Sequence, residues 1–317
     1  MSVIRIVDLF AGTGGFSMAF EKTSDRFKTV FANDIEPSSK KFFDLNVKST
    51  KLTLGDINEL VESDIPDCDI ITAGFPCQPF SLAGKKKGFE DSRSNVFWKL
   101  LKILEVKKPK AFLLENVKNL KTHNNGDTIK IVLKALEDIG YFVKYKVIDT
   151  SKISDIPQGR ERIYIVGFLE PNKFIFPSNR IERCSDIEKF LETEDTIPEK
   201  YFYEHSKIYD KICEEITDDV LDNVVYQYRR HYVRKNKSGV VPTLTANMGT
   251  GGHNVPLIFR DGRIRKLTPR ECFYFQGFQP DVKLPSVSDS QLYKLAGNGV
   301  SISVVEKIAK NILAEMN

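Results

Sequence analysis

The chain has 317 residues, a net charge of +4 at pH 7, 41% hydrophobic residues and 28% charged residues. This length allows one large domain or two modest ones, and the composition predicts a buried core. No apolar run reaches the roughly 18 residues of a membrane span, and the first residues lack the regions of a signal peptide. Five scattered cysteines without a C-x-x-C pair favour a cytoplasmic setting over a disulfide framework or a metal site.

The first predicted strand, residues 4–10, runs into a glycine-rich turn and then a helix from Phe16 to about Glu21. Gly12 and Gly14 would let the backbone turn tightly and approach a ligand. The turn lacks the G-x-G-x-x-G spacing used for pyrophosphate. It therefore favours a nucleotide-type cofactor without a pyrophosphate group.

Two acidic residues follow the next two predicted strands. Asp34 comes after residues 29–32, and Asp56 comes after residues 52–54. Either acid alone could cap a helix or close a turn. At successive strand ends, however, Asp34 could accept hydrogen bonds from ribose hydroxyls, as acids do in dinucleotide folds, and Asp56 could accept one from an adenine amino group. The cofactor we expect is adenosine-based, and S-adenosylmethionine fits better than NAD.

Cys77 follows a predicted strand at residues 69–73, in the turn Gly-Phe-Pro-Cys-Gln-Pro-Phe-Ser at 74–81. In open α/β sheets, ligands bind at the carboxyl edge, so a thiol there is a candidate nucleophile. A buried structural cysteine is the alternative, because cysteine packs as a small hydrophobe.

Glu115 follows another apolar strand, residues 111–114, and would face the same edge as Cys77. Arg160 and Arg162 flank the start of a strand at residues 162–168, where guanidinium groups could hold an acid or a polar ligand. A thiol, an acid and an arginine at one edge suit chemistry on a heterocycle.

The alternation of strands and helices, with a helix at about 128–139 and a strand at 141–148, predicts an α/β fold. We expect a doubly wound, mostly parallel sheet with a smaller, mixed second domain. A helical tail after residue 300 would pack back on the first domain. The predicted domains are residues 1–178 plus 284–317 for catalysis, and 179–283 for recognition.

Charge is segregated in the second domain. Residues 181–222 carry fourteen acidic side chains and five Lys or Arg, whereas residues 226–270 carry ten Lys or Arg and one acid. Tyrosines are interleaved in the basic stretch, which suits a phosphate backbone. The alternative is an ordinary solvated charged surface.

Taken together, the motifs resemble the DNA (cytosine-5)-methyltransferase family of bacterial restriction–modification systems. The resemblance runs nearly end to end and rests on the following motifs: DLFAGTGGF at 8–16, Asp34, GDI at 55–57, GFPCQPFS at 74–81, ENV at 115–117, QGRER at 158–162, RKLTPRECFYFQGF at 265–278 and GNGV at 297–300. It implies a methyltransferase fold and methylation of cytosine C5 in double-stranded DNA.

The resemblance assigns roles to the residues around Cys77. Cys77 would attack C6 of a cytosine flipped out of the duplex. Glu115 would hold N3 and the N4 amino group, Arg162 would bind O2, and Arg160 would order the loop or the acid. Gln78 would lie beside the nucleophile, on a mobile loop that closes on DNA. The loop lysines that would meet phosphates are Lys85, Lys86 and Lys87.

The resemblance also implies S-adenosylmethionine as cofactor, S-adenosylhomocysteine as product, and no metal. The expected cofactor contacts are Phe10, Gly12, Gly14, Asp34, Ile35, Asp56, Ile57, Pro76, Val96 and Asn298. Two positions depart from the family pattern: Asp34 stands where Glu is usual, and Gly299 stands where Ser is commoner.

The basic stretch lies where the family has its target-recognition region. The expected DNA contacts there are Arg229, Arg230, Arg234, Thr243, Thr245, Asn247 and His253. The arginines could pair with guanine or contact phosphates, and the sequence leaves both alternatives open.

Three other functions compete with this prediction. A transfer RNA methyltransferase would use the same machinery, but the sizeable basic region favours duplex DNA. A non-catalytic relative should have lost Cys77 or Glu115, and an NAD-linked oxidoreductase should have a pyrophosphate loop. We expect a monomeric, cytoplasmic, nucleoid-associated enzyme, linked in function to a restriction endonuclease but not necessarily bound to it.

Overall fold

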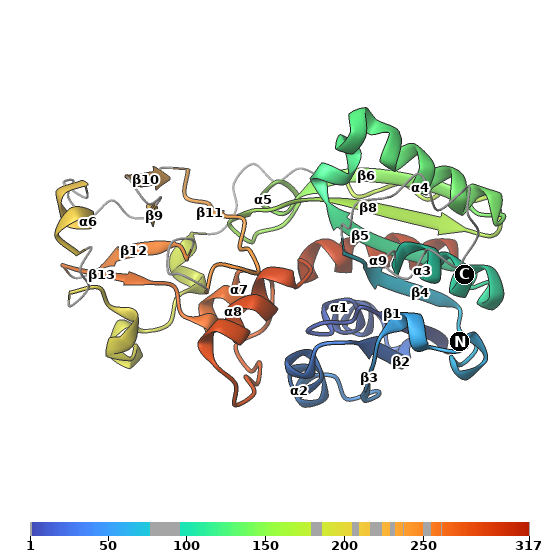
Figure 1. Ribbon diagram of the computed structural model, residues 1–317, viewed down its shortest axis with the longest axis horizontal. Helices are drawn as coiled ribbons and strands as arrows, with labels where there is room; N and C mark the ends of the chain where they lie inside the picture. Colours follow the sequence, from blue (N-terminus) through green and yellow to red (C-terminus); the bar gives the residue numbers. More distant parts are fainter. Residues whose placement is uncertain are drawn as a thin grey trace. The chain divides into compact units, whose positions relative to one another are not determined.

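A computed structural model of the protein describes most of the chain. The described residues are 2–76, 96–178, 186–204, 209–215, 224–228, 232–236, 238–249, 255–260 and 262–316. They form two compact units, which Figure 1 shows in sequence colours. The first unit comprises Met1–Ile148, Glu161–Ser178 and Val304–Asn317; the second comprises Asp149–Arg160 and Asn179–Ser303.

These units are defined by how compactly the chain packs, not by function. The catalytic and recognition domains predicted from the sequence therefore stay a prediction. The units differ from those boundaries in two segments. Residues 149–160 and 284–303 group with the second unit, although both were expected in the catalytic domain.

The first unit is built on a seven-stranded sheet in the order β3-β2-β1-β4-β5-β8-β6. Its strands are β1 Ile4–Leu9, β2 Phe27–Asp34, β3 Leu52–Leu54, β4 Ile70–Gly74, β5 Ala111–Val117, β6 Phe142–Asp149 and β8 Glu161–Phe168. Neighbours from β3 to β5 pair in parallel, whereas β8 runs antiparallel to β5. The predicted mostly parallel α/β sheet is confirmed.

The strand order reverses between β1 and β4. The chain moves outward from β1 through β2 to β3, and then returns to place β4 on the other side of β1. In doubly wound sheets, the carboxyl ends at such a switch point leave a crevice for a ligand.

Helices bury the apolar sides of this sheet. They are α1 Gly15–Thr23, α2 Pro37–Asn46, α3 Val96–Lys107, α4 Asp127–Asp138 and α9 Ile302–Glu315. One core cluster joins alternate residues of the central strands, such as Val7 and Ile71, to Leu100 of α3 and Val132 of α4. Lys22 of α1 forms an ion pair with Glu306 at 2.8 Å and so fastens α9 beside α1. No helix in the described part of the chain is long and apolar enough to span a bilayer.

The second unit contains a four-stranded antiparallel sheet in the order β10-β9-β12-β13. Its strands are β9 Val225–Tyr228, β10 Val233–Asn236, β12 Leu257–Arg260 and β13 Arg263–Lys266. A small parallel pair joins β7 Gln158–Gly159 to β11 Val241–Pro242. The helices of this unit are α5 Thr150–Ile153, α6 Tyr209–Glu215, α7 Pro269–Tyr274 and α8 Asp289–Asn298. This antiparallel sheet with helices matches the smaller, mixed domain of the prediction.

Candidate functional site

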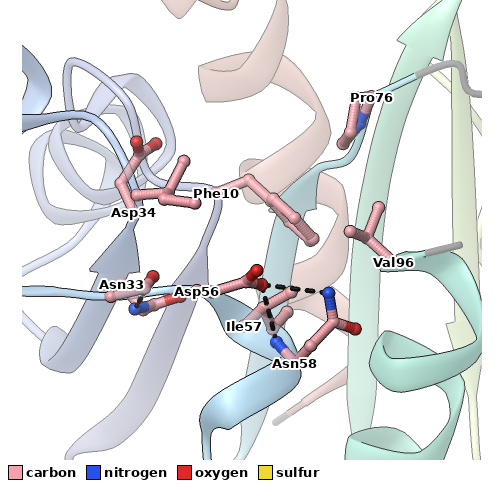
Figure 2. A pocket seen from close by; sticks show the side chains of 10 residues that line it. Phe10, Asn33, Asp34, Asp56, Ile57, Asn58, Pro76 and Val96 are labelled. Carbon is pink, nitrogen blue, oxygen red and sulfur yellow. Dashed lines mark hydrogen bonds between the residues drawn. The ribbon is translucent and has the colours of Figure 1, made fainter. Parts of the chain in front are cut away.

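A cavity of about 300 Å³ opens at the carboxyl ends of β1 to β4, at the switch point of the sheet. Its lining residues are Phe10, Asn33, Asp34, Ile35, Gly55, Asp56, Ile57, Asn58, Pro76 and Val96. Figure 2 shows the Phe10 ring lying between the two acids on one side and Pro76 and Val96 on the other. We call this space the strand-end cavity. Most of the cofactor contacts predicted from the sequence meet here.

Asp34 closes the glycine turn from the end of β2. Its Oδ2 accepts a hydrogen bond from the Gly12 amide at 2.8 Å, and its Oδ1 accepts one from the Glu36 amide at 2.8 Å. Burial raises the pKa of the Asp34 carboxyl, although these bonds favour its charged form. Each oxygen has a second lone pair, so the carboxylate can still accept a ligand hydroxyl.

Asp56 both caps a turn and lines the strand-end cavity. It is the N-cap of a short 3-10 turn at Ile57–Glu59, and it accepts hydrogen bonds from the Asn58 amide at 2.9 Å and from Asn58 Nδ2 at 3.0 Å. Asp56 therefore acts as a helix cap, as the alternative expected, and the same residue also lines the cavity (Figure 2).

Asn33, Gly55 and Asn58 also line the cavity, and the sequence reasoning missed them. Asn33 Nδ2 donates to the carbonyls of Thr53 and Gly55, both at 3.0 Å, and so holds the end of β3 beside β2. Their position directly beside the predicted acids was the available signal.

The two predicted glycines support the cavity without lining it. Gly12 has φ +53° and Gly14 has φ +75°, which glycine adopts without steric cost. A Cβ on Gly14 would lie 2.7 Å from Val47 Cγ2 and 2.9 Å from Phe43 Cδ2. Gly14 therefore permits the close packing of the turn against α2.

A buried carboxyl group anchors this turn to the sheet. Asp8 of β1 accepts hydrogen bonds from Ser17 Oγ at 2.6 Å and from Thr72 Oγ1 at 2.9 Å. It thus ties the start of α1 to β4. Burial raises the pKa of Asp8 to about 7, against the opposing effect of these hydrogen bonds.

The chemistry of the strand-end cavity fits S-adenosylmethionine. Asp34 offers a hydroxyl acceptor, and Phe10, Ile57 and Val96 offer apolar surface for an adenine ring. Two carboxyl groups and no basic side chain stand among the described lining residues. Such a lining disfavours the pyrophosphate of a dinucleotide and favours a cationic sulfonium group.

Glu115 lies near the end of β5 and pairs in register with Gly74, the last residue of β4. Arg162 Nε lies 3.1 Å from Glu115 Oε1, and both side chains are largely buried. The antiparallel start of β8 brings Arg162 to this edge, opposite Val117. Asn116 Nδ2 donates to the Phe75 carbonyl at 2.9 Å and fixes the chain just before Cys77. The structure therefore unites Glu115 and Arg162, as predicted.

Arg160 is buried and bonds to backbone carbonyls of the second unit. Nη1 donates to Leu244 O at 3.0 Å, and Nη2 donates to Gly297 O at 3.1 Å and Gly299 O at 2.7 Å. These bonds make Arg160 an organiser of the segments around 244 and 297–299, whereas its predicted role in ordering the loop or Glu115 stays a prediction. Asn298, the last residue of α8, is exposed and also lies in the second unit.

Two of the three described cysteines, Cys68 and Cys272, are buried and poor nucleophiles. Burial raises the pKa of Cys68 to about 12 and holds the pKa of Cys272 well above its ordinary value. Since the thiolate is the reactive form, neither thiol suits covalent catalysis. Cys77, Gln78, Lys85, Lys86 and Lys87 lie outside the described residues.

In the second unit, the acidic segment (residues 181–222) neutralises most of the described arginines of the basic stretch (residues 226–270). Arg265 is fully buried and contacts Glu194 at 2.7 Å and Glu271 at 2.8 Å. Arg263 contacts Glu204 at 2.7 Å. The remaining pairs of this kind are Arg260–Glu188 and Arg270–Glu192. Much of the charge segregation seen in the sequence is therefore taken up by ion pairs within the chain, of which only Arg265–Glu271 is fully buried.

Four of the predicted DNA contacts line one cavity of about 830 Å³ in the second unit: Arg234, Thr243, Thr245 and Asn247. We call it the recognition cavity. Arg229, Arg230 and His253 lie outside the described residues. Thr243 Oγ1 donates to the Gly159 carbonyl at 2.5 Å, and Thr245 Oγ1 donates to Asn247 Oδ1 at 2.9 Å.

Comparison with known proteins matches this geometry to one family. Residues 4–314 match the C-5 cytosine-specific DNA methylase family. The chain is 45% identical to type II methyltransferase M.Bsp6I of Bacillus sp. (strain RFL6), over 99% of this chain and 100% of that protein. It is 39% identical to type II methyltransferase M.HaeII of Haemophilus aegyptius, over 100% and 95%. The fold resembles the crystal structure of S. pombe Dnmt2 methyltransferase, with a TM-score of 0.76 and 20% identity over the whole of both chains.

Proposed function

This chain belongs to the C-5 cytosine-specific DNA methylase family and is a type II DNA (cytosine-5) methyltransferase of restriction–modification systems, and from this premise we propose its mechanism. It methylates C5 of a cytosine flipped out of a specific short duplex sequence, through a covalent bond between Cys77 and C6. The modification protects host DNA from a cognate endonuclease. The Glu115–Arg162 pair carries the proposal. Glu115 pairs in register with Gly74, the last residue of β4, and Cys77 follows Gly74 by three residues in the sequence.

The chain's own groups activate a ring carbon that is a poor nucleophile. The Cys77 thiolate adds to C6, and the electrons of the C5–C6 double bond move towards C5 as Glu115 gives a proton to N3. Arg162 holds O2 and keeps the Glu115 carboxyl oriented, since its guanidinium lies 3.1 Å from that carboxyl. An ordinary thiol is only a few per cent thiolate at pH 7, so proton donation to the ring must accompany attack.

Bound S-adenosylmethionine supplies an electrophilic methyl group on a sulfonium. The residues proposed to hold it are Phe10, Asp34, Ile35, Asp56, Ile57, Pro76 and Val96, supported by Gly12 and Gly14, with Asn298 as a further contact. Asp34 would bind the ribose hydroxyls and Asp56 the adenine amino group. After methylation, water takes the C5 proton, and the electrons of the C5–H bond re-form the C5–C6 double bond, so that the sulfur leaves C6 as the Cys77 thiolate, while N3 returns its proton to Glu115.

Duplex DNA would lie against basic and polar groups of two regions: the lysine-rich loop at 85–87 and the basic stretch at 226–270. The proposed contacts are Lys85, Lys86, Lys87, Arg229, Arg230, Arg234, Thr243, Thr245, Asn247 and His253, with Gln78 beside the nucleophile in the catalytic site. Arg160 would act through position, by holding the segment that carries Thr243 and Thr245.

Bisulfite sequencing of plasmid DNA from cells that express the gene tests this function. We expect full methylation of one cytosine within one short sequence, and none with Cys77→Ser. Glu115→Gln should lower kcat by about 10²–10⁴-fold, the usual contribution of a proton donor. Both variants should still bind DNA. Undiminished turnover by Cys77→Ser, or methylation of transfer RNA alone, would overturn the proposal.

A further inference from the structure

The recognition cavity is built from two stretches of chain, residues 149–159 and 227–247, that are far apart in the sequence. Its lining residues are Asp149, Ser151, Lys152, Gly159, Gln227, Arg234, Asn236, Ser238, Val240, Val241, Pro242, Thr243, Thr245 and Asn247. At about 830 Å³ it falls within the range of about 300–1,000 Å³ common for ligand pockets. Its lining is dominated by hydroxyl, amide and charged side chains, which suits a polar ligand.

The segment before β8 belongs to the same body as the recognition strands. β7 pairs with β11, and Gln158 Oε1 accepts a hydrogen bond from the Leu244 amide at 3.2 Å. Thr243 bonds to the Gly159 carbonyl, as described above. The Thr150 amide of α5 donates to the Arg160 carbonyl at 3.0 Å, so helix α5, which carries Lys152, is tied to this same segment.

Lys152 and Arg234 are the cations among the described lining residues, and both side chains are exposed. Neither forms an ion pair with a described residue, in contrast to the four arginines that the acidic segment neutralises. The one acid of the lining, Asp149, accepts hydrogen bonds from the Ser151 amide at 3.1 Å and from Ser151 Oγ at 3.0 Å. The lining therefore carries two cations and one carboxylate, and no described ion pair neutralises either cation, so both can meet an anionic ligand.

The two cations stand on different supports. Arg234 lies on β10, directly across from Gln227 of β9, so a strand pair fixes its backbone next to another donor and acceptor. Lys152 lies on the single turn of α5 and ends in a flexible ammonium group. A flexible point charge suits a phosphate, whereas reading a base edge needs a planar, fixed set of donors.

We propose that Lys152 binds a backbone phosphate of the DNA substrate at the recognition cavity. This assignment rests on the proposed function. It adds a DNA contact from Lys152, a residue that the sequence placed in the predicted catalytic domain and not among the DNA contacts. The role of Lys152 is to position the duplex against the face that carries Arg234 and Gln227, without reading a base. Its loss should weaken cognate and non-cognate DNA equally.

The test measures the affinity of a short duplex carrying the recognised sequence at several salt concentrations. Each neutralised phosphate contributes about 0.9 to the slope of log K against log salt. Lys152→Ala should reduce the magnitude of the slope by about 0.9, and Lys152→Arg should restore the wild-type slope. Lys189→Ala is the matched control, because Lys189 is exposed in the same unit but does not line the cavity. Its slope should equal that of the wild type.

Bisulfite sequencing separates failure of this proposal from failure of the function. Wild type and Lys152→Ala should modify the same cytosine in the same sequence. An unchanged slope in Lys152→Ala, with wild-type methylation intact, would overturn the phosphate contact alone. A changed recognition sequence in Lys152→Ala would also overturn it, because the residue would then read a base. A thermal unfolding midpoint equal to that of wild type confirms that the variant is folded.

Discussion

The two cavities differ in how the chain builds them. The strand-end cavity takes its lining from consecutive strand ends and the loops after them, all within residues 10–96. The recognition cavity joins residues 149–159 to residues 227–247. Local sequence order fixes the first cavity, whereas the second exists only once distant segments have packed together.

The two cavities also use charge differently. The strand-end cavity presents two carboxyl groups and no described cation, which suits a cationic cofactor. The recognition cavity presents two cations that have no ion-pair partner among the described residues, while the acidic segment neutralises Arg260, Arg263, Arg265 and Arg270. Cations that lack an acidic partner therefore indicate DNA binding better than the total number of basic residues does.

The largest expected effect comes from adding one methyl group to the second unit. A Cβ on Gly297 would lie 2.2 Å from the carbonyl carbon of Thr245 and 2.4 Å from the Ala246 amide nitrogen. Since backbone atoms cannot move aside cheaply, Gly297→Ala should destabilise the protein by about 1–3 kcal/mol or more. It should also displace Thr245 from the recognition cavity and weaken DNA binding.

Thermal unfolding and DNA titration measure these losses. Cofactor affinity should fall less than DNA affinity, because Asn298 is the only predicted cofactor contact in the second unit. Gly55→Ala is the control for stability and DNA affinity, since nothing lies within 4 Å of its added Cβ; it is not a control for cofactor affinity, because Gly55 lines the strand-end cavity. Equal stability of Gly297→Ala and Gly55→Ala would show that α8 and the segment at 245–246 separate easily.

The sequence predicted the first unit far better than the second. Buried parallel strands read as apolar runs, so β1 to β5 were found with boundaries close to those observed. The strands of the second unit are only four residues long, and their sequences, VYQY, VRKN, LIFR and RIRK, share no clear period. The reversed direction of β8 and the ion-pair partners of Arg263 and Arg265 depend on tertiary packing, which no local pattern encodes.

Asp34→Ala tests the strand-end cavity alone. The change removes the acceptor of the Gly12 amide and the proposed acceptor of the ribose hydroxyls. A hydrogen bond to a charged group contributes about 1.5–3 kcal/mol, so calorimetry should show cofactor binding weakened by roughly 10–100-fold. DNA affinity should stay at the wild-type value. Asp64→Ala, an exposed acid outside the cavity, is the control.

The pH dependence of cofactor binding adds a second measure. Because burial raises the pKa of Asp34, its carboxylate protonates at a higher pH than an ordinary aspartate. Cofactor affinity of the wild type should therefore fall as the pH is lowered, and that of Asp34→Ala should fall less. Identical pH profiles for the two proteins would contradict a role for Asp34 as acceptor.

The smallest expected effect concerns Asp8, the buried anchor of the glycine turn. An unfolded aspartate ionises near pH 3.8, whereas Asp8 in the folded protein ionises near pH 7. Between these values the folded chain holds a proton that the unfolded chain has lost, so stability falls as the pH rises through this window. Asp8→Asn removes this titration. The amide can still accept from Ser17 and donate to Thr72.

The unfolding midpoint of Asp8→Asn should therefore gain on that of the wild type as the pH is raised from 4 to 8. One kcal/mol corresponds to about 2–4 °C for a unit of this size, and we expect at least that difference. Asp64→Asn, an exposed acid, should show no such trend. A difference that stays constant with pH would mean that Asp8 is already ionised throughout, and the turn beside the strand-end cavity would then rest on a buried charge.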